Sequence, residues 1–294
     1  LKQVDIAIIE CGMGGEIDAT NVFTPILSII TSVSLEHTDF LGRSLNEVAL
    51  HKAGIIKKDI PVLIPTLDEE AEMTIASVAK SKKSKIYKGR EINSYTYHNN
   101  GIIFSYALFN NIYLPSSAYY EIKNASLAIE SALILREKYP FSDKIIENCF
   151  ENCEIPARMQ VFDLGCKVIV DGAHNPEAID GLVDSMFKKY QGIPIHIIFA
   201  NFIDKNMTIM LPKLSVLSKD LTLTTFDNPR ARKEEDYFIF LDDFPFEQDY
   251  KKLIKEKMAM YPNDIILVTG CLAFAGIVSE QFKKGEYDDV CPAS

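Results

Sequence analysis

Two polar side chains suited to binding a cation follow apolar segments near the start of the sequence. Glu10 comes directly after the apolar run 4–9, and His37 follows a second apolar run, 26–33. Open α/β sheets bind ligands at the carboxyl ends of their parallel strands, where a carboxylate and an imidazole from neighbouring strands can point at one ion. Mg²⁺ generally prefers oxygen ligands, which fits Glu10 better than His37. A lone histidine is more often structural, so both interpretations of His37 stay open.

A glycine cluster and a lysine lie close to these two residues in the sequence. Gly12, Gly14 and Gly15 let the backbone turn sharply or approach a ligand closely. The cluster lacks the Lys-Ser/Thr ending of a P-loop, so a plain strand-to-loop turn explains it equally well. Lys52 is predicted near the end of a helix over 45–56. There it either complements the helix dipole or acts in an active site.

The second half of the chain carries its own polar groups at strand ends. Asp171 and His174 come directly after the predicted strand 168–170. Arg158 precedes this strand, and its guanidinium could bridge to a phosphate. Arg230 lies in another strand-end turn. Because the whole chain carries a net charge of −10, an anionic substrate must meet a local basic site, and these arginines are candidates for it.

Apolar runs rich in β-branched residues, each followed by loop or helix-forming sequence, predict a parallel α/β sheet in the first half. Residues 95–114 alternate polar and apolar around Asn99-Asn100-Gly101, which predicts a peripheral hairpin. The predicted strands are 4–9, 26–33 and 60–64, and the predicted helices are 45–56, 69–79, 121–138 and 143–152.

The alternation restarts after Met159 and predicts a second α/β unit. Pro156 separates the two patterns, so we expect one domain over 1–154 and a second over 155–294. The strands predicted for the second domain are 168–170, 195–199, 221–224, 237–241 and 265–268.

Composition restricts the class of protein. With 294 residues, 47% of them hydrophobic, the chain can bury a large core. Its negative charge opposes binding to nucleic acid or to an anionic membrane, and no apolar run approaches the roughly 18 residues of a membrane helix. The six scattered cysteines fit reduced thiols, and no export segment is recognisable. We therefore expect a soluble cytoplasmic protein, a monomer by default, with no nucleic-acid or membrane partner.

Five segments, in order along the chain, resemble the Mur ligase superfamily, and most closely its folylpolyglutamate synthase / dihydrofolate synthase branch. The resemblance implies an α/β fold: part of a P-loop-type ATPase domain, followed by a smaller Rossmann-like C-terminal domain. The five segments are 10–21 (ECGMGGEIDATN), 37–42 (HTDFLG), 52–57 (KAGIIK), 171–176 (DGAHNP) and 228–231 (NPRA).

The resemblance also implies roles for residues of the first domain. In that family the residues matching Glu10 and His37 bind Mg²⁺, and the lysine matching Lys52 is carbamylated. Asp18 resembles a residue that helps to bind the pterin or folate substrate. Asn124 looks like the asparagine that contacts adenine.

In the second domain, Arg158, Asp171 and His174 match positions that close over ATP and the acyl phosphate. The resemblance implies that Asp171 and His174 are catalytic as well as ATP-binding. Arg230, in the NPRA segment, is a candidate for binding a substrate.

The implied activity is an ATP-dependent ligase that adds L-glutamate to a folate or dihydropteroate carboxylate through an acyl phosphate, with Mg²⁺ as cofactor and ATP as co-substrate. The alternatives are another amide ligase of the superfamily, such as a cell-wall precursor ligase, or a non-catalytic fragment. A nucleotide-binding oxidoreductase is disfavoured because no GxGxxG follows any strand of the second half. Whether the acceptor is dihydropteroate, a glutamylated folate or both is not decided by the sequence.

The sequence departs from the family at several positions. The family's P-loop is expected upstream of Leu1, so the chain alone is not expected to hydrolyse ATP. Glu16 stands where the family commonly has arginine, Glu36 where it has aspartate, and Cys271 where it has serine. These differences concern substrate contacts more than the reaction class.

Overall fold

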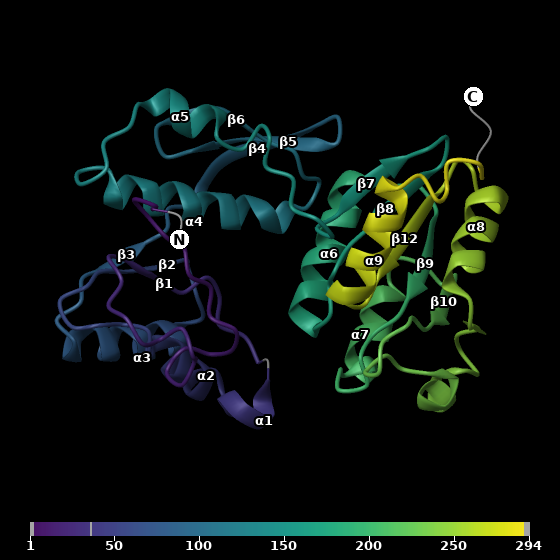
Figure 1. The fold of residues 1–294 in the computed structure, drawn as a ribbon, viewed down its shortest axis with the longest axis horizontal. Helices are drawn as coiled ribbons and strands as arrows, with labels where there is room; N and C mark the ends of the chain where they lie inside the picture. Colours follow the sequence, from purple (N-terminus) through teal and green to yellow (C-terminus); the bar gives the residue numbers. More distant parts are fainter. Residues whose placement is uncertain (1–2, 36, 291–294) are drawn as a thin grey trace. The chain divides into compact units, whose positions relative to one another are not determined.

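The computed structural model describes residues 3–35 and 37–290 (Figure 1). Contacts divide the chain into two compact units. The assignment of residues 1–154 and 155–294 to two domains stays a prediction. Unit 1 comprises Leu1–Asn93, Tyr106–Leu108 and Lys123–Ile146, and unit 2 comprises Ser94–Ser105, Phe109–Ile122 and Glu147–Ser294.

Unit 1 is built on a three-stranded parallel sheet with strand order β1-β2-β3. Helix α2 starts at a capping box in which Ser44 accepts the backbone N–H of Glu47 and the Glu47 carboxylate reaches back. Buried side chains of the strands and of α2 and α3 form a continuous apolar core. The elements are β1 (Ser28–Ile29), β2 (Val62–Ile64), β3 (Ile86–Lys88), α1 (Thr38–Leu41), α2 (Leu45–Ala53) and α3 (Glu69–Ser81).

A second small sheet and two helices connect this part of the chain to the C-terminal half. The sheet has the strand order β4-β5-β6, and the predicted turn at Asn99 is confirmed, with φ of 51° at that residue. A further turn, at Ala107, was not predicted. The elements are β4 (Ile92–His98), β5 (Gly101–Tyr106), β6 (Phe109–Leu114), α4 (Tyr119–Leu135) and α5 (Asp143–Asn148).

The predicted strand over 4–9 is wrong. Residues 3–10 adopt no strand, and Val4, Ile6, Ile8 and Ile9 are 43–96% exposed. An apolar parallel strand forms where neighbouring strands pair with it and helices cover both faces. Within the described part of the chain this segment has no strand partner, so its apolar pattern alone does not produce a strand. The second predicted strand, 26–33, is reduced to β1.

Unit 2 contains a doubly wound six-stranded sheet with strand order β11-β10-β9-β12-β8-β7, as Figure 1 shows for most of its strands. All neighbouring pairs are parallel except β7 with β8. Residues of α6 and α7 belong to one apolar core, and those of α8 and α9 to another. The elements are β7 (Gln160–Asp163), β8 (Lys167–Val170), β9 (Ile195–Phe199), β10 (Leu221–Thr224), β11 (Phe246–Glu247), β12 (Ile265–Thr269), α6 (Pro176–Lys189), α7 (Met207–Leu214), α8 (Tyr250–Met260) and α9 (Leu272–Lys283).

The predicted strand over 237–241 is also wrong, because Glu234–Phe240 forms a 3₁₀ helix, η1. Glu234, Glu235 and Asp236 occupy its first turn, and Asp236 accepts the backbone N–H of Lys233. Acidic side chains at a helix start are favoured by the exposed N–H groups there, and this outweighs the apolar pattern that follows.

Polar and charged side chains join the amino ends of three strands of the unit 2 sheet. The ring of His196, in β9, lies with Nδ1 2.5 Å from Oδ2 of Asp220 and with Nε2 2.9 Å from Oδ2 of Asp264. Asp220 immediately precedes β10, and Asp264 immediately precedes β12. Lys257 of α8 donates to Asp220 Oδ1 at 2.7 Å, and the His196 ring stacks on Tyr261.

Within the described residues, no helix combines the length and apolar character needed to cross a membrane.

Candidate functional site

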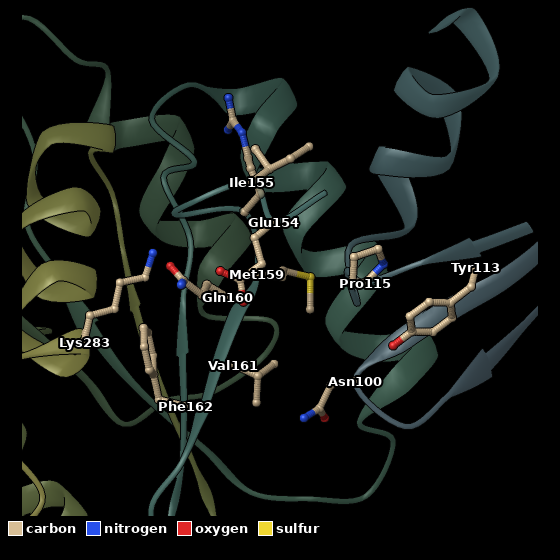
Figure 2. A pocket seen from close by; sticks show the side chains of 11 residues that line it. Asn100, Tyr113, Pro115, Glu154, Ile155, Met159, Gln160, Val161, Phe162 and Lys283 are labelled. Carbon is tan, nitrogen blue, oxygen red and sulfur yellow. The ribbon is translucent and has the colours of Figure 1, made fainter. Parts of the chain in front are cut away.

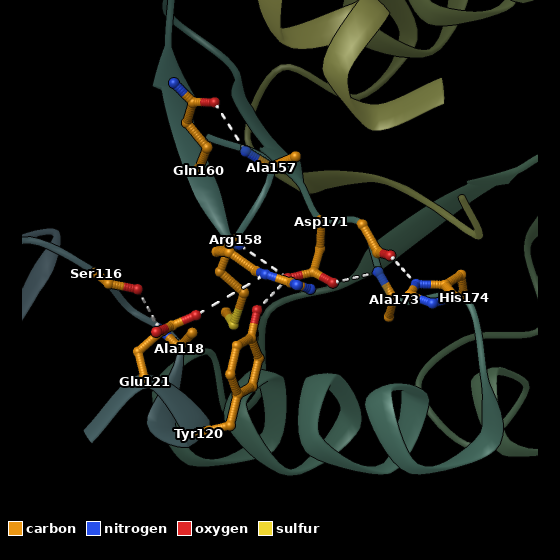
Figure 3. Close-up of polar contacts among 12 residues, drawn as sticks. Ser116, Ala118, Tyr120, Glu121, Ala157, Arg158, Gln160, Asp171, Ala173 and His174 are labelled. Atoms are coloured by element: carbon orange, nitrogen blue, oxygen red, sulfur yellow. Dashed lines mark hydrogen bonds and ion pairs between the residues drawn. The ribbon is translucent and has the colours of Figure 1, made fainter. Parts of the chain in front are cut away.

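The carboxyl end of β8 carries Asp171, a carboxylate enclosed by protein donors (Figure 3). Its Oδ2 accepts the hydroxyl of Tyr120 at 2.6 Å and the backbone N–H of Met159 at 2.9 Å. Its Oδ1 accepts the backbone N–H of Ala173 at 2.8 Å. Asp171 is only 1% exposed. The carboxylate therefore organises the surrounding backbone as well as lying where a ligand of the sheet would bind.

Burial changes the pKa values of both Asp171 and Tyr120. It raises the pKa of the Asp171 carboxyl, although its hydrogen bonds and the charge of Arg158 act in the opposite direction. Burial is also the largest reason that the pKa of the Tyr120 hydroxyl is raised well above its usual value, and the neighbouring carboxylate adds to it. The tyrosine hydroxyl thus keeps its proton at neutral pH and acts as the donor.

Arg158 is presented by a tight turn between two residues in the left-handed region. Ala157 has φ of 57° and Met159 has φ of 43°. The carbonyl of Ala157 accepts the backbone N–H of Gly172 at 2.8 Å, and the N–H of Met159 is bound by Asp171. The side chain of Arg158 keeps 31% of its surface exposed, and the turn is therefore able to offer a guanidinium to solvent or to an anion.

His174 lies two residues after Gly172, in the loop before α6. Its Nδ1 is 3.0 Å from the carbonyl oxygen of Gly172, and since a carbonyl only accepts, Nδ1 is the donor. In the neutral ring this tautomer leaves Nε2 as an acceptor. Asn175 then caps α6 by accepting the N–H of Ala178 at 2.7 Å, with Pro176 in the first turn as expected.

A cavity of about 480 Å³ lies within unit 2, and Figure 2 shows Met159 and Gln160 among the residues that line it. Arg158 also lines this cavity. This volume is in the range of small-molecule sites. Its lining combines charged, amide and aromatic side chains and consists of Asn100, Tyr113, Pro115, Glu154, Ile155, Arg158, Met159, Gln160, Val161, Phe162 and Lys283.

Arg230 lies after β10, and its side chain contacts two nearby residues. Its guanidinium pairs with Asp204 at 3.0 Å and lies over the ring of Phe202. Burial raises the pKa of Asp204, but the hydrogen bond from Arg230 and the charge of Lys205 outweigh it, so this pKa lies below its usual value. Arg230 is 62% exposed, which leaves it accessible to a ligand.

Cys271 lies between β12 and α9 and is buried. Burial raises the pKa of its thiol, so a thiolate is disfavoured. The residue is therefore a small buried side chain at the N-cap position of α9, not a nucleophile.

The residues expected at the metal site lie in unit 1. Glu10 and His37 are exposed, and His37 precedes α1 with φ of 49°. The Nζ of Lys52 donates to the carbonyl oxygen of Ser32 at 3.0 Å. No group of three or more His, Cys, Asp or Glu among the described residues is arranged to hold a metal ion. Glu36 lies outside the described residues.

Asp18 organises the glycine-rich loop. Its Oδ2 accepts the N–H groups of Gly12 and Met13 at 2.8 and 2.9 Å, and its Oδ1 accepts both the N–H and the hydroxyl of Thr20. The hydroxyl of Thr20, together with these backbone donors, lowers the pKa of Asp18 to about 2. Asn124, expected to contact adenine, is exposed on α4.

Arg158, Asp171 and His174 thus come together at one end of β8, whereas Arg230 follows β10 and the remaining candidates belong to unit 1. Tyr120 and Glu121, which contact this cluster, were not singled out from the sequence. A tyrosine and a glutamate at the start of a helix have no distinctive spacing, so only the tertiary structure reveals them.

Comparison with known proteins shows which families this chain resembles. Residues 157–272 match the family model described as Mur ligase, glutamate ligase domain. This part of the chain is therefore similar to the glutamate ligase domain of the Mur ligases. Folylpolyglutamate synthase of Lacticaseibacillus casei is 28% identical over 97% of this chain and 68% of its own length. Dihydrofolate synthase/folylpolyglutamate synthase of Bacillus subtilis is 27% identical over 96% of this chain and 68% of its own length.

Solved structures of folylpolyglutamate synthases have the same fold as this chain. The apo form of the L. casei folylpolyglutamate synthase superposes with a TM-score of 0.81 at 27% identity, over 95% of this chain and 67% of that one. The Mycobacterium tuberculosis enzyme, in complexes with ADP and AMPPCP, reaches a TM-score of 0.87 at 21% identity, over 95% of this chain and 69% of that one, and shows the shared fold. This chain spans about two thirds of the length of these relatives. The predicted fold class and family resemblance are confirmed.

Proposed function

We propose that this chain acts as an ATP-dependent ligase, which joins L-glutamate to a folate or dihydropteroate carboxylate through an acyl phosphate. The observation that carries the proposal is the match over 97% of the chain to a folylpolyglutamate synthase. The cluster at the end of β8 supports it, because Arg158 and His174 offer a cation and a ring nitrogen at the edge of the sheet where such folds bind ligands.

The proposed chemistry requires positive charge at the phosphoryl group. A carboxylate attacks the γ-phosphate of ATP, so two anions must approach each other, and cationic groups offset their repulsion in the transition state. Arg158 supplies a guanidinium whose planar donors suit phosphate oxygens. We assign Asp171 and His174 to the same ATP-binding cluster, Asn124 to adenine, and Asp18 and Arg230 to substrate binding. The first step transfers the γ-phosphoryl group to the carboxylate and releases ADP. The amine of glutamate then attacks the acyl carbonyl, so the amide bond forms while inorganic phosphate leaves and the amine loses a proton.

We further propose Mg²⁺ as cofactor, with Glu10 and His37 as ligands and Lys52, as a carbamate, supporting the site. Mg²⁺ usually keeps several waters and binds through one or two protein oxygens together with substrate phosphates. The exposed Glu10 carboxylate fits that mode, and a closed cage of protein side chains is not required. When bound, the ion would neutralise charge on the phosphates. The chain is proposed to act as a cytoplasmic monomer.

The decisive experiment measures ADP release by the complete reading frame that encodes this chain. The protein receives MgATP and glutamate together with dihydropteroate, a tetrahydrofolate or a cell-wall precursor in turn. We expect release that requires both glutamate and a pterin substrate. Release only with the cell-wall precursor would assign the protein to another branch of the superfamily, and no release with any acceptor would refute the ligase proposal.

The metal assignment is tested separately. We expect Glu10→Ala and His37→Ala to abolish ADP release while the circular dichroism spectrum stays unchanged, because both side chains are exposed and removing them leaves no cavity. Near-normal turnover of either variant removes that residue from the metal site.

A further inference from the structure

Two consecutive residues at the start of α4 contact the groups around Arg158 (Figure 3). The hydroxyl of Tyr120 donates to Oδ2 of Asp171, and the same oxygen accepts the N–H of Met159, the residue after Arg158. The carboxylate of Glu121 lies 4.0 Å from Nε of Arg158. One contact thus reaches Arg158 through its backbone and the other through its guanidinium.

Packing orders the Tyr120 ring independently of the hydrogen bond that its hydroxyl donates to Asp171. It packs against the apolar core of α6 and α7. It also lies beside Gly181 of α6, where an added Cβ would be 3.3 Å from Cδ1 of the ring. Because the ring is already ordered, its hydrogen bond requires little further loss of side-chain entropy.

Glu121 is the buried member of its ion pair. Glu121 is 3% exposed, whereas the side chain of Arg158 keeps 31% of its surface exposed. The pair is formed by Nε, one of several guanidinium N–H groups. A buried carboxylate can therefore fix the direction of the side chain while the outer N–H groups face a ligand.

The backbone of the turn around Arg158 requires contacts that hold it in place. Ala157 and Met159 are both in the left-handed region, where non-glycine residues persist only when surrounding contacts hold them. Asp171 supplies one of these contacts through the N–H of Met159, and Tyr120 in turn binds Asp171. Losing the tyrosine hydroxyl leaves the buried Oδ2 with one donor instead of two.

We propose that Tyr120 and Glu121 are positioning residues that fix Arg158 in the orientation needed to bind the phosphates of ATP. The inference rests on the proposed function, which assigns Arg158 to ATP. Tyr120 acts through Asp171 and the backbone of Met159, and Glu121 acts directly on the guanidinium. Neither residue is required to touch the nucleotide.

The test uses the complete reading frame and the variants Tyr120→Phe and Glu121→Gln. Tyr119→Phe is the matched control, because it removes a hydroxyl from the neighbouring ring, which packs against Tyr95 and Lys188 instead. We expect each test variant to raise the Kd for MgATP and the KM for ATP about 10-fold. Tyr120→Phe loses a hydrogen bond to a charged group, and Glu121→Gln loses the charge of the buried partner of Arg158. The KM for glutamate and the values for Tyr119→Phe should stay at wild type.

Two further variants separate positioning from general stability. Gly181→Ala keeps every polar group but requires the Tyr120 ring to shift by a few tenths of an ångström, and we expect it to weaken ATP binding in the same direction as Tyr120→Phe but by less. In an Arg158→Ala background, Glu121→Gln should not weaken ATP binding further, because the guanidinium that it orients is gone.

The inference is overturned when Tyr120→Phe and Glu121→Gln bind MgATP as Tyr119→Phe does. It is also overturned when Glu121→Gln weakens binding equally with and without Arg158. A wild-type protein that binds no MgATP refutes the proposed function itself, which is a distinguishable result.

Discussion

The hydroxyl of Tyr120 donates a 2.6 Å hydrogen bond to the carboxylate of Asp171, joining the first turn of α4 to the end of β8. With the N–H groups of Met159 and Ala173, this gives Asp171 three protein donors in a position that is 1% exposed. A carboxylate bound in this way is part of the fold as well as of the site.

Replacing Asp171 with asparagine should therefore destabilise the protein. The amide has one acceptor oxygen, so at least one buried N–H or hydroxyl loses its partner, at a cost of about 1 to 3 kcal/mol. Urea unfolding of the wild type and the variant measures the loss. Asp163→Asn, on the exposed side of β7, is the control and should stay within about 0.5 kcal/mol of wild type. Equal stability of both variants would contradict the structural role of Asp171.

Asp18 should titrate at unusually low pH. Its folded-state pKa of about 2 lies below its usual value of 3.8, so its stabilising hydrogen bonds are fully present above pH 4 and are lost as the pH falls toward 2. In NMR spectra, the amide shifts of Gly12 and Met13 should change with a midpoint near pH 2. This transition should be absent in Asp18→Asn. A midpoint near 4 in the wild type would show that these hydrogen bonds do not hold the loop.

Lys189 should make stability rise with pH in the alkaline range. Its ammonium donates to the carbonyl of Asn99 and the hydroxyl of Ser117. Burial, together with the charge of Lys167, lowers the pKa of Lys189 from 10.5 to about 8. Between these values the unfolded chain binds more protons than the folded one, so the unfolding free energy increases as the pH rises. We expect the wild type to gain stability relative to Lys189→Met between pH 8 and 10.5, measured by urea unfolding. An unchanged difference between the two proteins would argue against this titration.

His196→Gln should destabilise unit 2 without affecting nucleotide binding. The glutamine cannot contact Asp220 and Asp264 at once, so one of the two contacts made by His196 is lost. Water offsets part of this loss because both carboxylates are partly exposed, so we expect about 1 to 2 kcal/mol by urea unfolding. Lys213→Gln, which breaks the exposed pair with Asp180, should change stability by less than about 1 kcal/mol. A shifted MgATP affinity in His196→Gln would contradict the separation of this cluster from the site.

The sequence predicted the strands of unit 2 well where local and tertiary preferences agree. Residues 195–199, 221–224 and 265–268 are short apolar runs rich in β-branched side chains, and all three form strands at nearly these bounds. Such strands are buried on both faces, so their composition alone identifies them. The edge strands β7 and β11 were missed because an edge strand has a weaker apolar pattern.

The wrong predictions concern segments whose structure depends on contacts with residues distant in the sequence. The run 4–9 has the composition of a central strand, yet no described strand pairs with it. The positions of Asp171 and His174 at a strand end followed from the pattern. The contacts that Tyr120 and Glu121 make with this cluster did not, because they join segments about 40 to 50 residues apart, and no local spacing encodes them.

The cluster around His196 lies at the amino edge of the unit 2 sheet, whereas Asp171 and His174 lie at its carboxyl edge. The two edges therefore accept mutations independently. Substitutions at Asp220, Asp264 or Lys257 are therefore expected to change stability without changing what the opposite edge binds. Conversely, substitutions in the loops after β8, β9 and β12 are expected to change ligand preference while the contacts of His196 keep the amino ends of the strands together.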